Sequence, residues 1–302
     1  MRGRVLAVIP ARFGSTRLPG KPLLPMLSGE PMVAHVVRQA LAATCVHRVL
    51  VATDHDAIAE AAAAAGAEPV LTDSALPTGT DRVAAALRLR PSEAAAADVV
   101  VNVQGDEPLV QPEAIDLAAS ILLTHKAAEM ATLSAPLPAG ALQDASKVKV
   151  VCGPSLRNPQ ALDGVEPWQH APTAGVTCRE ALFFSRAPIG IPRDVLQKLL
   201  AGGVDGPSSA PVEPEPGAAR LHVGMYAFRP AALQRFVELP VSRLEQLEQL
   251  EQLRALEAGM RILVGEVEHA SFGVDTREDV LRIERMWREA NAEERRTLRG
   301  GA

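Results

Sequence analysis

The sequence predicts an open α/β fold in which a parallel sheet is covered by helices on both faces. Short, wholly apolar runs rich in β-branched residues alternate with helical patterns through the first half of the chain. Strands that are apolar on both faces are typical of parallel sheets buried between two helix layers. Ligands of such sheets bind beyond the carboxyl ends of the strands, so the segments that follow the strands are the candidates for function.

The expected elements follow from apolar periodicity, helix formers and turn residues. Strands are predicted at 5–10, 46–52, 69–71, 99–103, 130–136, 147–152, 222–228 and 261–267. Helices are predicted at 31–42, 56–65, 80–89, 243–256 and 277–288. Residues 199–220 are rich in Gly, Pro, Ser and Ala, which indicates a surface loop. We expect one domain, 1–302, with a catalytic core at 1–130 and 240–290 and a smaller inserted subregion at about 130–240.

Composition narrows the class of protein. The 302 residues carry 31 basic and 36 acidic side chains, a net charge of −5, which argues against general nucleic-acid binding. No stretch has the roughly 18–20 apolar residues that span a bilayer, so membrane insertion is not expected. The three cysteines form no CxxC pair, so we expect neither a disulfide framework nor a zinc site. A reducing, cytoplasmic location fits best.

A basic loop follows the first predicted strand. It reads PARFGSTRLPGKP at 10–22 and places Arg12, Arg17 and Lys21 beside two glycines and two hydroxyl side chains. Glycines let backbone N–H groups approach a polyanion, and guanidinium groups match phosphate oxygens in pairs. The spacing fits neither GxxxxGK[ST] nor GxGxxG. A polyphosphate-binding loop and an exposed loop of solvated charges both remain open on spacing alone.

Two acidic segments are candidate metal sites. Asn102, Gln104 and Asp106 alternate along the end of the strongest predicted strand, and alternate residues of a strand share a face. A carboxylate there could hold Mg²⁺, which typically takes one or two carboxylates plus substrate phosphates. A plain polar turn is the alternative. Near the C-terminus, Asp275 could reach a metal, although Asp275 or Thr276 could equally be a helix N-cap.

Weaker features leave their alternatives open. The segment 78–82 could contact a nucleobase or simply begin a helix. His222 opens an apolar run, where a lone histidine is more often structural than an extra donor to an acid. Leucines at 244, 247, 250 and 253 indicate helix packing, and Glu251 and Gln252 lie between them.

Together these segments closely resemble the 3-deoxy-manno-octulosonate cytidylyltransferases, also called CMP-KDO synthetases. Nine blocks occur in the order of that family and span nearly the whole chain. They are IPARFGSTRLPGKPL (9–23), VATDHD (51–56), TGTDR (78–82), VNVQGDEPL (101–109), KVV (149–151), FFSRAPI (183–189), HVGMYAFR (222–229), LEQLRALEAG (250–259) and GVDTREDV (273–280).

The resemblance implies a nucleotidyltransferase fold, Rossmann-like or GT-A-like, with a mixed, mainly parallel sheet. The inserted subregion would bind the sugar and form a homodimer interface. The reaction would join CTP and 3-deoxy-D-manno-octulosonate (KDO) into CMP-KDO and pyrophosphate, with Mg²⁺, for lipopolysaccharide biosynthesis. The anomeric hydroxyl would attack the α-phosphorus in line, and no dedicated general base stands out.

The resemblance also implies roles for single residues. The nucleotide would contact Ala11, Arg12, Ser15, Thr16, Arg17, Lys21, Gly79, Thr80, Arg82 and Asp106. The sugar acid would contact Gln104, Arg186, His222, Tyr226, Glu251 and Gln252. Asp106 and Asp275 would ligate Mg²⁺, and Arg12, Arg17 and Lys21 would neutralise charge on the leaving group.

Two departures from the family pattern stand out. Leu76 and Thr78 replace a histidine and a serine that the family usually carries, and the loop at about 202–217 is longer and richer in proline. The alternatives are a CMP-sialic acid synthetase, another sugar nucleotidyltransferase of the same fold, or a non-catalytic nucleotide-binding protein. The presence of both Asp106 and Asp275 argues against the last.

Overall fold

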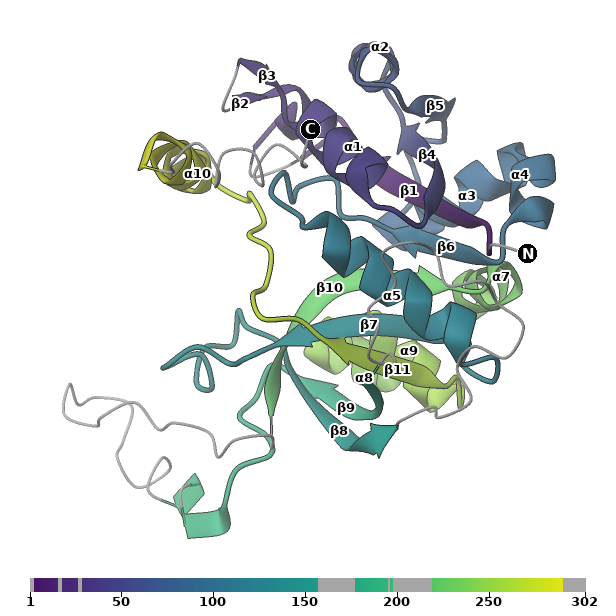
Figure 1. Cartoon of the computed structure of the whole chain (residues 1–302). Helices are drawn as coiled ribbons and strands as arrows, with labels where there is room; N and C mark the ends of the chain where they lie inside the picture. The colour runs from purple at the N-terminus through teal and green to yellow at the C-terminus, as the bar shows by residue number, and fades with distance from the viewer. Residues whose placement is uncertain are drawn as a thin grey trace.

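A single large sheet dominates the molecule (Figure 1). The computed structural model describes residues 3–15, 18–26, 29–156, 177–194, 196–197 and 219–289. Over these residues nine strands form one sheet in the order β5-β4-β1-β6-β10-β7-β11-β9-β8, and β2 and β3 form a separate two-stranded ribbon. Within the described part of the chain, no helix is both long and apolar enough to cross a membrane.

The bounds of the elements are as follows. The strands are β1 Val5–Ala11, β2 Pro25–Met26, β3 Glu30–Pro31, β4 Val46–Thr53, β5 Glu68–Leu71, β6 Val99–Asn102, β7 Met130–Ala135, β8 Lys149–Leu156, β9 Cys178–Ser185, β10 Arg220–Phe228 and β11 Ile262–Glu266. The helices are the 3₁₀ turn η1 Lys21–Leu23, and α1 Met32–Ala42, α2 Asp56–Ala64, α3 Gly79–Leu89, α4 Pro91–Ala96, α5 Pro112–Thr124, α7 Pro230–Glu238, α8 Arg243–Glu248, α9 Gln252–Glu257 and α10 Arg277–Glu289.

The sheet is parallel in its first half and mixed in its second. β1 pairs in parallel with both β4 and β6, and β4 pairs in parallel with β5. β10 is antiparallel to β6 and β7, whereas β11 runs parallel to β7. The expected α/β fold with a mixed sheet is therefore confirmed. Because β4, β1 and β6 are parallel neighbours, the segments that follow them meet at one edge of the sheet.

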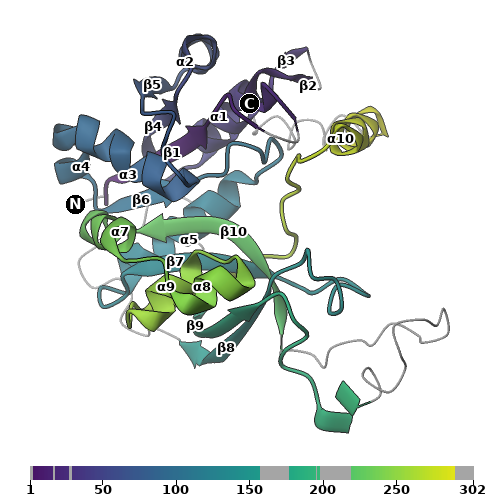
Figure 2. The same cartoon turned by 180° about the vertical axis from the view of Figure 1, so that it is seen from behind.

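Two hydrophobic layers enclose the sheet. One face packs against α1, α2 and α5, through buried residues such as Val36, Ile58 and Ile121. The other packs against α3, α7 and α9, through residues such as Leu87 and Phe236, and Figure 2 shows these helices from behind. All four residues of β6 are buried, which matches its reading as a strand that is apolar on both faces.

Most predicted elements are confirmed to within two residues, but the helix predicted at 243–256 is wrong. It breaks into α8 and α9 at Gln249, whose φ of 54° lies in the left-handed region. The Arg186 side chain donates to the carbonyl oxygens of Glu248 and Gln249, which draws both away from helical bonding. The leucine stripe is accordingly divided: Leu253 is buried, whereas Leu247 is 71% exposed.

Among the described residues, seven elements lie outside the predicted ones: η1, β2, β3, α4, α5, β9 and α7. β9 carries Arg179 and Glu180 inside an otherwise apolar run, so its pattern is broken in the sequence. The expected loop at 199–220 lies outside the described residues except for its last two positions, and Arg220 there begins β10.

A close backbone approach fixes the turn after β6. A Cβ atom on Gly105 would lie 2.4 Å from the carbonyl oxygen of Pro10, far inside van der Waals contact. Only glycine lets the turn at 104–106 lie against the end of β1. The position of Asp106 relative to the basic loop therefore depends on glycine, which has no side chain, at position 105.

Gly105→Ala should lower the free energy of unfolding by about 2 kcal/mol, because either β1 or the turn must shift. Gly153→Ala is the matched control, since its Cβ would lie 3.8 Å from the nearest atom, the Glu180 carbonyl oxygen. Urea unfolding of both variants measures the effect. Equal stability of the two variants would show that the approach at Gly105 places no constraint on the turn.

Candidate functional site

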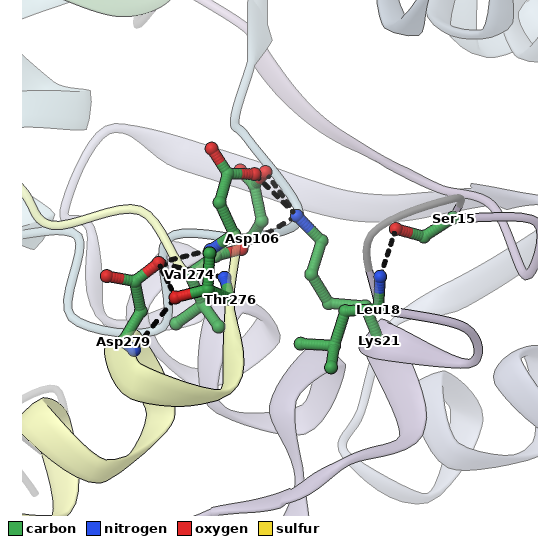
Figure 3. A network of polar contacts seen from close by, with 8 residues as sticks. Ser15, Leu18, Lys21, Asp106, Val274, Thr276 and Asp279 are labelled. Carbon is green, nitrogen blue, oxygen red and sulfur yellow. Dashed lines mark hydrogen bonds and ion pairs between the residues drawn. The ribbon is translucent and has the colours of Figure 1, made fainter. Parts of the chain in front are cut away.

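Three segments that are far apart in the sequence meet at the ammonium group of Lys21. Its Nζ lies 2.8 Å from Asp106 Oδ2 and 3.3 Å from Asp275 Oδ1, and it donates to the Val274 carbonyl oxygen at 2.7 Å (Figure 3). The Lys21 side chain is 15% exposed, against 36% for Asp106 and 45% for Asp275. The ammonium is thus shielded, while both carboxylates remain open to a ligand.

A tight turn aims Lys21 at the two carboxylates. Gly20 has φ 68°, a left-handed conformation that suits glycine, and it begins the 3₁₀ turn η1. Inside the loop, Ser15 Oγ accepts a hydrogen bond from Leu18 N at 3.3 Å, and Lys21 N donates to the Leu18 carbonyl oxygen at 3.1 Å. These bonds fold the loop back on itself so that Lys21 reaches across the sheet edge.

Backbone bonds hold the two carboxylates beside each other. Val274 N donates to the Asp106 carbonyl oxygen at 2.8 Å, which joins the C-terminal segment to the turn after β6. Thr276 and Asp279 exchange hydrogen bonds as in a capping box at the start of α10, and Asp279 also accepts from Asp275 N at 2.9 Å. Thr276 therefore acts as the helix cap, and the Asp275 carboxylate faces Lys21.

The donor set around Lys21 suits a hard divalent cation. Among the described residues, no group of three or more His, Cys, Asp and Glu side chains gathers for a metal. Two carboxylates and the Val274 carbonyl nevertheless already converge on one cationic group. Mg²⁺ typically takes one or two carboxylates and completes its shell with substrate phosphates and water. Asp106 and Asp275 could therefore hold Mg²⁺ together with a bound polyphosphate.

The rest of the basic loop lies partly outside the described residues. Ala11 ends β1 and is buried, whereas Arg12, which follows it, is exposed. Thr16 and Arg17 lie outside the residues that the structure describes. The structure therefore brings Lys21 to the carboxylates and leaves the expected contacts of Thr16 and Arg17 undescribed.

A second polar cluster lies at the start of α3. Thr80 Oγ1 donates to Glu251 Oε1 at 2.7 Å and accepts from Asn102 Nδ2 at 3.3 Å. Thr78 caps α3 by accepting from Asp81 N at 3.0 Å, so its hydroxyl serves the helix at the position where the family usually has serine. Gly79 begins the helix, and Arg82 is buried one turn on.

His222 and Tyr226 of β10 extend this second cluster. Their ring centroids lie 5.6 Å apart, and Glu251 is close enough to raise the pKa of Tyr226, although burial is the larger cause. Burial also raises the pKa of Glu251, while its hydrogen bond to Thr80 lowers it. A carboxyl group of raised pKa beside hydroxyl groups is suited to hydrogen bonding with a polyol.

The tautomer of His222 follows from its neighbours. Thr132 Oγ1 lies 2.9 Å from His222 Nε2 and also bonds the carbonyl oxygens of Val223 and Met225. Because the Thr132 hydroxyl has one hydrogen and faces two carbonyl oxygens, we assign the donor role to His222 Nε2. Removal from water lowers the pKa of His222 to about 3.

The remaining expected sugar contacts divide into two kinds. Gln104 Nε2 donates to the Gly224 carbonyl oxygen at 2.8 Å, and Gln252 is buried beside Glu251. Arg186, in contrast, directs its guanidinium to the backbone oxygens of Ala145, Glu248 and Gln249. Arg186 thus binds the backbone of the bend between α8 and α9.

Sequence reasoning missed two residues that support these clusters. Glu107 accepts a hydrogen bond from Ser271 Oγ beside Asp106, and burial raises its pKa to about 7. Asp54 accepts from Phe13 N at 2.8 Å and pairs with Arg82. Asp54 could have been predicted as a site residue because it directly follows β4, at the same sheet edge as Lys21.

The fold and the site define a nucleotide-dependent transferase, with a basic loop and two carboxylates at the carboxyl edge of an α/β sheet. Residues 6–262 match the family described as cytidylyltransferase. A 3-deoxy-manno-octulosonate cytidylyltransferase of Bdellovibrio bacteriovorus is 42% identical over 94% of this chain and 97% of its own. One from Anaeromyxobacter sp. is 46% identical over 92% of this chain and 94% of its own.

Solved structures agree with these relatives. CMP:2-keto-3-deoxy-manno-octonic acid synthetase complexed with CTP superposes with a TM-score of 0.75, at 32% identity over 95% of this chain and 99% of that one. A cytidylyltransferase from Leptospira borgpetersenii, at 15% identity and a TM-score of 0.55, shares the fold. This chain therefore belongs to the 3-deoxy-manno-octulosonate cytidylyltransferase family.

In the His222→Gln variant, the free energy of unfolding should decrease less steeply as the pH falls. The folded state keeps His222 neutral down to about pH 3, whereas the unfolded state takes up its proton near pH 6.5. Stability is therefore lost as pH falls through this window, by up to about 1.4 kcal/mol per pH unit. Glutamine keeps a donor for Thr132 and does not titrate.

Urea unfolding between pH 7 and pH 4 measures the difference, with His269→Gln as the control because His269 is exposed. A His222→Gln curve parallel to that of the wild type across this range would contradict a neutral, partly buried His222.

Proposed function

We propose that this chain transfers CMP from CTP to 3-deoxy-D-manno-octulosonate and releases pyrophosphate, for lipopolysaccharide biosynthesis. The observation that carries the proposal is the meeting of Lys21, Asp106 and Asp275 at the sheet edge. This arrangement occurs in a chain whose relatives of that name are 42% and 46% identical over nearly full length. A structure of similar fold is described as a complex with CTP.

The basic loop would bind and orient the triphosphate. Lys21 would exchange its carboxylate partners for phosphate oxygens, while Arg12 and Arg17 would neutralise charge that develops on the leaving pyrophosphate. Holding the anomeric hydroxyl in line with the α-phosphorus supplies much of the rate of such a transfer. As the bond from this hydroxyl oxygen to the α-phosphorus forms, the bond from the α-phosphorus to the oxygen that bridges it to the β-phosphorus of CTP breaks. That oxygen leaves with pyrophosphate, and the hydroxyl proton passes to solvent.

The metal that we propose for this all-oxygen donor set is Mg²⁺. Asp106 and Asp275 would hold it, and when bound it supplies positive charge to the phosphate oxygens. Lys21 already shows that these two carboxylates can share one cation. Its ammonium would keep them close together until the nucleotide arrives.

The second cluster would receive the sugar acid. Glu251, which accepts a hydrogen bond from the expected nucleotide contact Thr80, offers carboxylate oxygens. Gln104 follows β6, and His222 and Tyr226 lie on the neighbouring strand β10. Hydroxyl groups of an eight-carbon sugar acid could replace water at these positions. The same residues would exclude water from the anomeric hydroxyl.

The rival substrates are sialic acid and sugar phosphates. Purified protein with CTP and Mg²⁺ should release pyrophosphate with KDO and at least a hundredfold more slowly with sialic acid, about 3 kcal/mol of discrimination. Faster release with sialic acid or a sugar phosphate would contradict the proposed substrate. Nucleotide binding without turnover of any acceptor would favour a non-catalytic nucleotide-binding protein.

Two further expectations concern assembly and location. We expect a homodimer, and the exposed side chains of Leu182 on β9 and Leu247 on α8 are apolar groups that a second copy could cover. Sedimentation at micromolar concentration would test it. Cys45, Cys152 and Cys178 are all unpaired, which supports a reducing cytoplasm.

Asp106→Asn should lower kcat by about a thousandfold while leaving the fold intact, because the site loses one of two charges that hold the metal. Pyrophosphate release at saturating CTP and Mg²⁺ measures it, with circular dichroism as the check on folding. Near-normal turnover at saturating Mg²⁺ would contradict the role of Asp106.

Lys21→Met should tighten binding of Mn²⁺ to the nucleotide-free protein, by on the order of tenfold, because the Lys21 ammonium no longer competes with the metal for the two carboxylates. The same change should weaken CTP binding. Electron paramagnetic resonance counts bound Mn²⁺, and titration calorimetry gives the Kd of CTP. Lys126→Met, which removes an exposed lysine, is the control. Unchanged or weaker Mn²⁺ binding would contradict competition between Lys21 and the metal.

A further inference from the structure

The segment VATDHD has no part in the reaction described above, although it ends a strand beside the basic loop. β4 ends at Thr53, and it runs parallel to β1 with Thr53 opposite Ala11. Asp54 therefore lies beside the first residues of the basic loop. Its side chain is only 9% exposed, so its charge must be paired within the protein.

One carboxylate oxygen of Asp54 anchors the loop. Oδ1 accepts from Phe13 N at 2.8 Å, and the Phe13 carbonyl oxygen in turn accepts from Ser15 N at 3.0 Å and Gly20 N at 3.2 Å. The Phe13 ring stacks on His55, with ring centroids 4.1 Å apart and an interplanar angle of 13°. The Phe13 carbonyl oxygen thus links Ser15 and Gly20 of the basic loop, and Asp54 links Phe13 to the end of β4.

The other oxygen faces a buried guanidinium. Asp54 Oδ2 lies 3.3 Å from Arg82 Nη2, and Arg82, which is 2% exposed, also donates from Nη1 to Thr72 Oγ1 at 2.7 Å. Burial lowers the pKa of Arg82, Asp54 raises it, and the nearby Arg12 lowers it. Arg12 and Arg82 therefore repel each other, and the Asp54 carboxylate offsets that repulsion.

We propose that Asp54 is a positioning residue of the triphosphate site, which holds the basic loop against β4 and keeps Arg12 beside the buried Arg82. This inference rests on the proposed function, because the loop is taken to bind the triphosphate of CTP. Without the carboxylate, Phe13 N loses its acceptor and the two guanidinium groups repel without compensation. Asp54 itself touches neither substrate.

Steady-state kinetics with both substrates test this role, because the loop serves only one of them. Asp54→Ala should raise the KM for CTP by about tenfold, the equivalent of one hydrogen bond to a charged group. The KM for KDO should stay within twofold of the wild type. Asp54→Asn, which keeps an acceptor for Phe13 N but not the charge, should raise the KM for CTP by a smaller factor.

Asp116→Ala is the matched control. The Asp116 carboxylate likewise anchors a loop, by accepting from Thr44 N at 3.0 Å and Cys45 N at 2.8 Å, but it lies on α5 away from the basic loop. Its loss should lower stability and leave the KM for CTP unchanged. A rise in the KM for CTP in this variant would mean that the readout reports lost stability alone, and would overturn the proposal.

The possible results distinguish failure of the proposed function from failure of the positioning role of Asp54. If wild-type protein shows no CTP binding by calorimetry, the proposed function and the positioning role both fail. If the wild type binds CTP and the Asp54→Ala variant has an unchanged KM for CTP, the positioning role alone is overturned. Should Asp54→Ala not fold, Asp54→Asn decides, and an unchanged KM for CTP in that variant would equally overturn it.

Discussion

The geometry of the candidate site depends on one ammonium group shared by two carboxylates. Asp106 and Asp275 would repel each other without a cation between them, and Lys21 supplies that charge at 2.8 and 3.3 Å. The pairing joins the loop after β1, the turn after β6 and the start of α10. A metal ion could replace the Lys21 ammonium between the two carboxylates, and a polyphosphate could replace the carboxylates as the partner of Lys21. Each exchange would substitute one charged group for another of the same sign.

The end of β6 distributes its side chains to both halves of the site. Asn102 contacts Thr80 in the second cluster, Gln104 contacts the Gly224 carbonyl oxygen on β10, and Asp106 contacts Lys21. One short segment therefore connects the expected sugar subsite to the expected phosphate subsite. Because Gly105 has no side chain, this segment lies against Pro10. That contact holds the turn after β6, and with it both subsites, in place relative to the end of β1.

The parallel strands were predictable because apolar, β-branched residues dominate them, and their carboxyl ends placed Lys21 and Asp106 at one edge. The break in the helix at Gln249 was not predictable from local sequence. It involves Arg186, 63 residues earlier in the chain, whose side chain competes for the helix carbonyl oxygens. Spacing alone could not pair Asp275 with Lys21, since 254 residues separate them. A motif likewise does not reveal the backbone oxygens that the Arg186 guanidinium bonds.

A crystal structure with CTP and Mn²⁺ in place of Mg²⁺ tests the central claim most directly. The anomalous signal of Mn²⁺ marks the metal independently of the fitted coordinates. The account predicts a peak between Asp106 and Asp275, with the Lys21 ammonium moved onto phosphate oxygens. A Mn²⁺ peak elsewhere, with Lys21 still bridging the two carboxylates beside bound CTP, would contradict it.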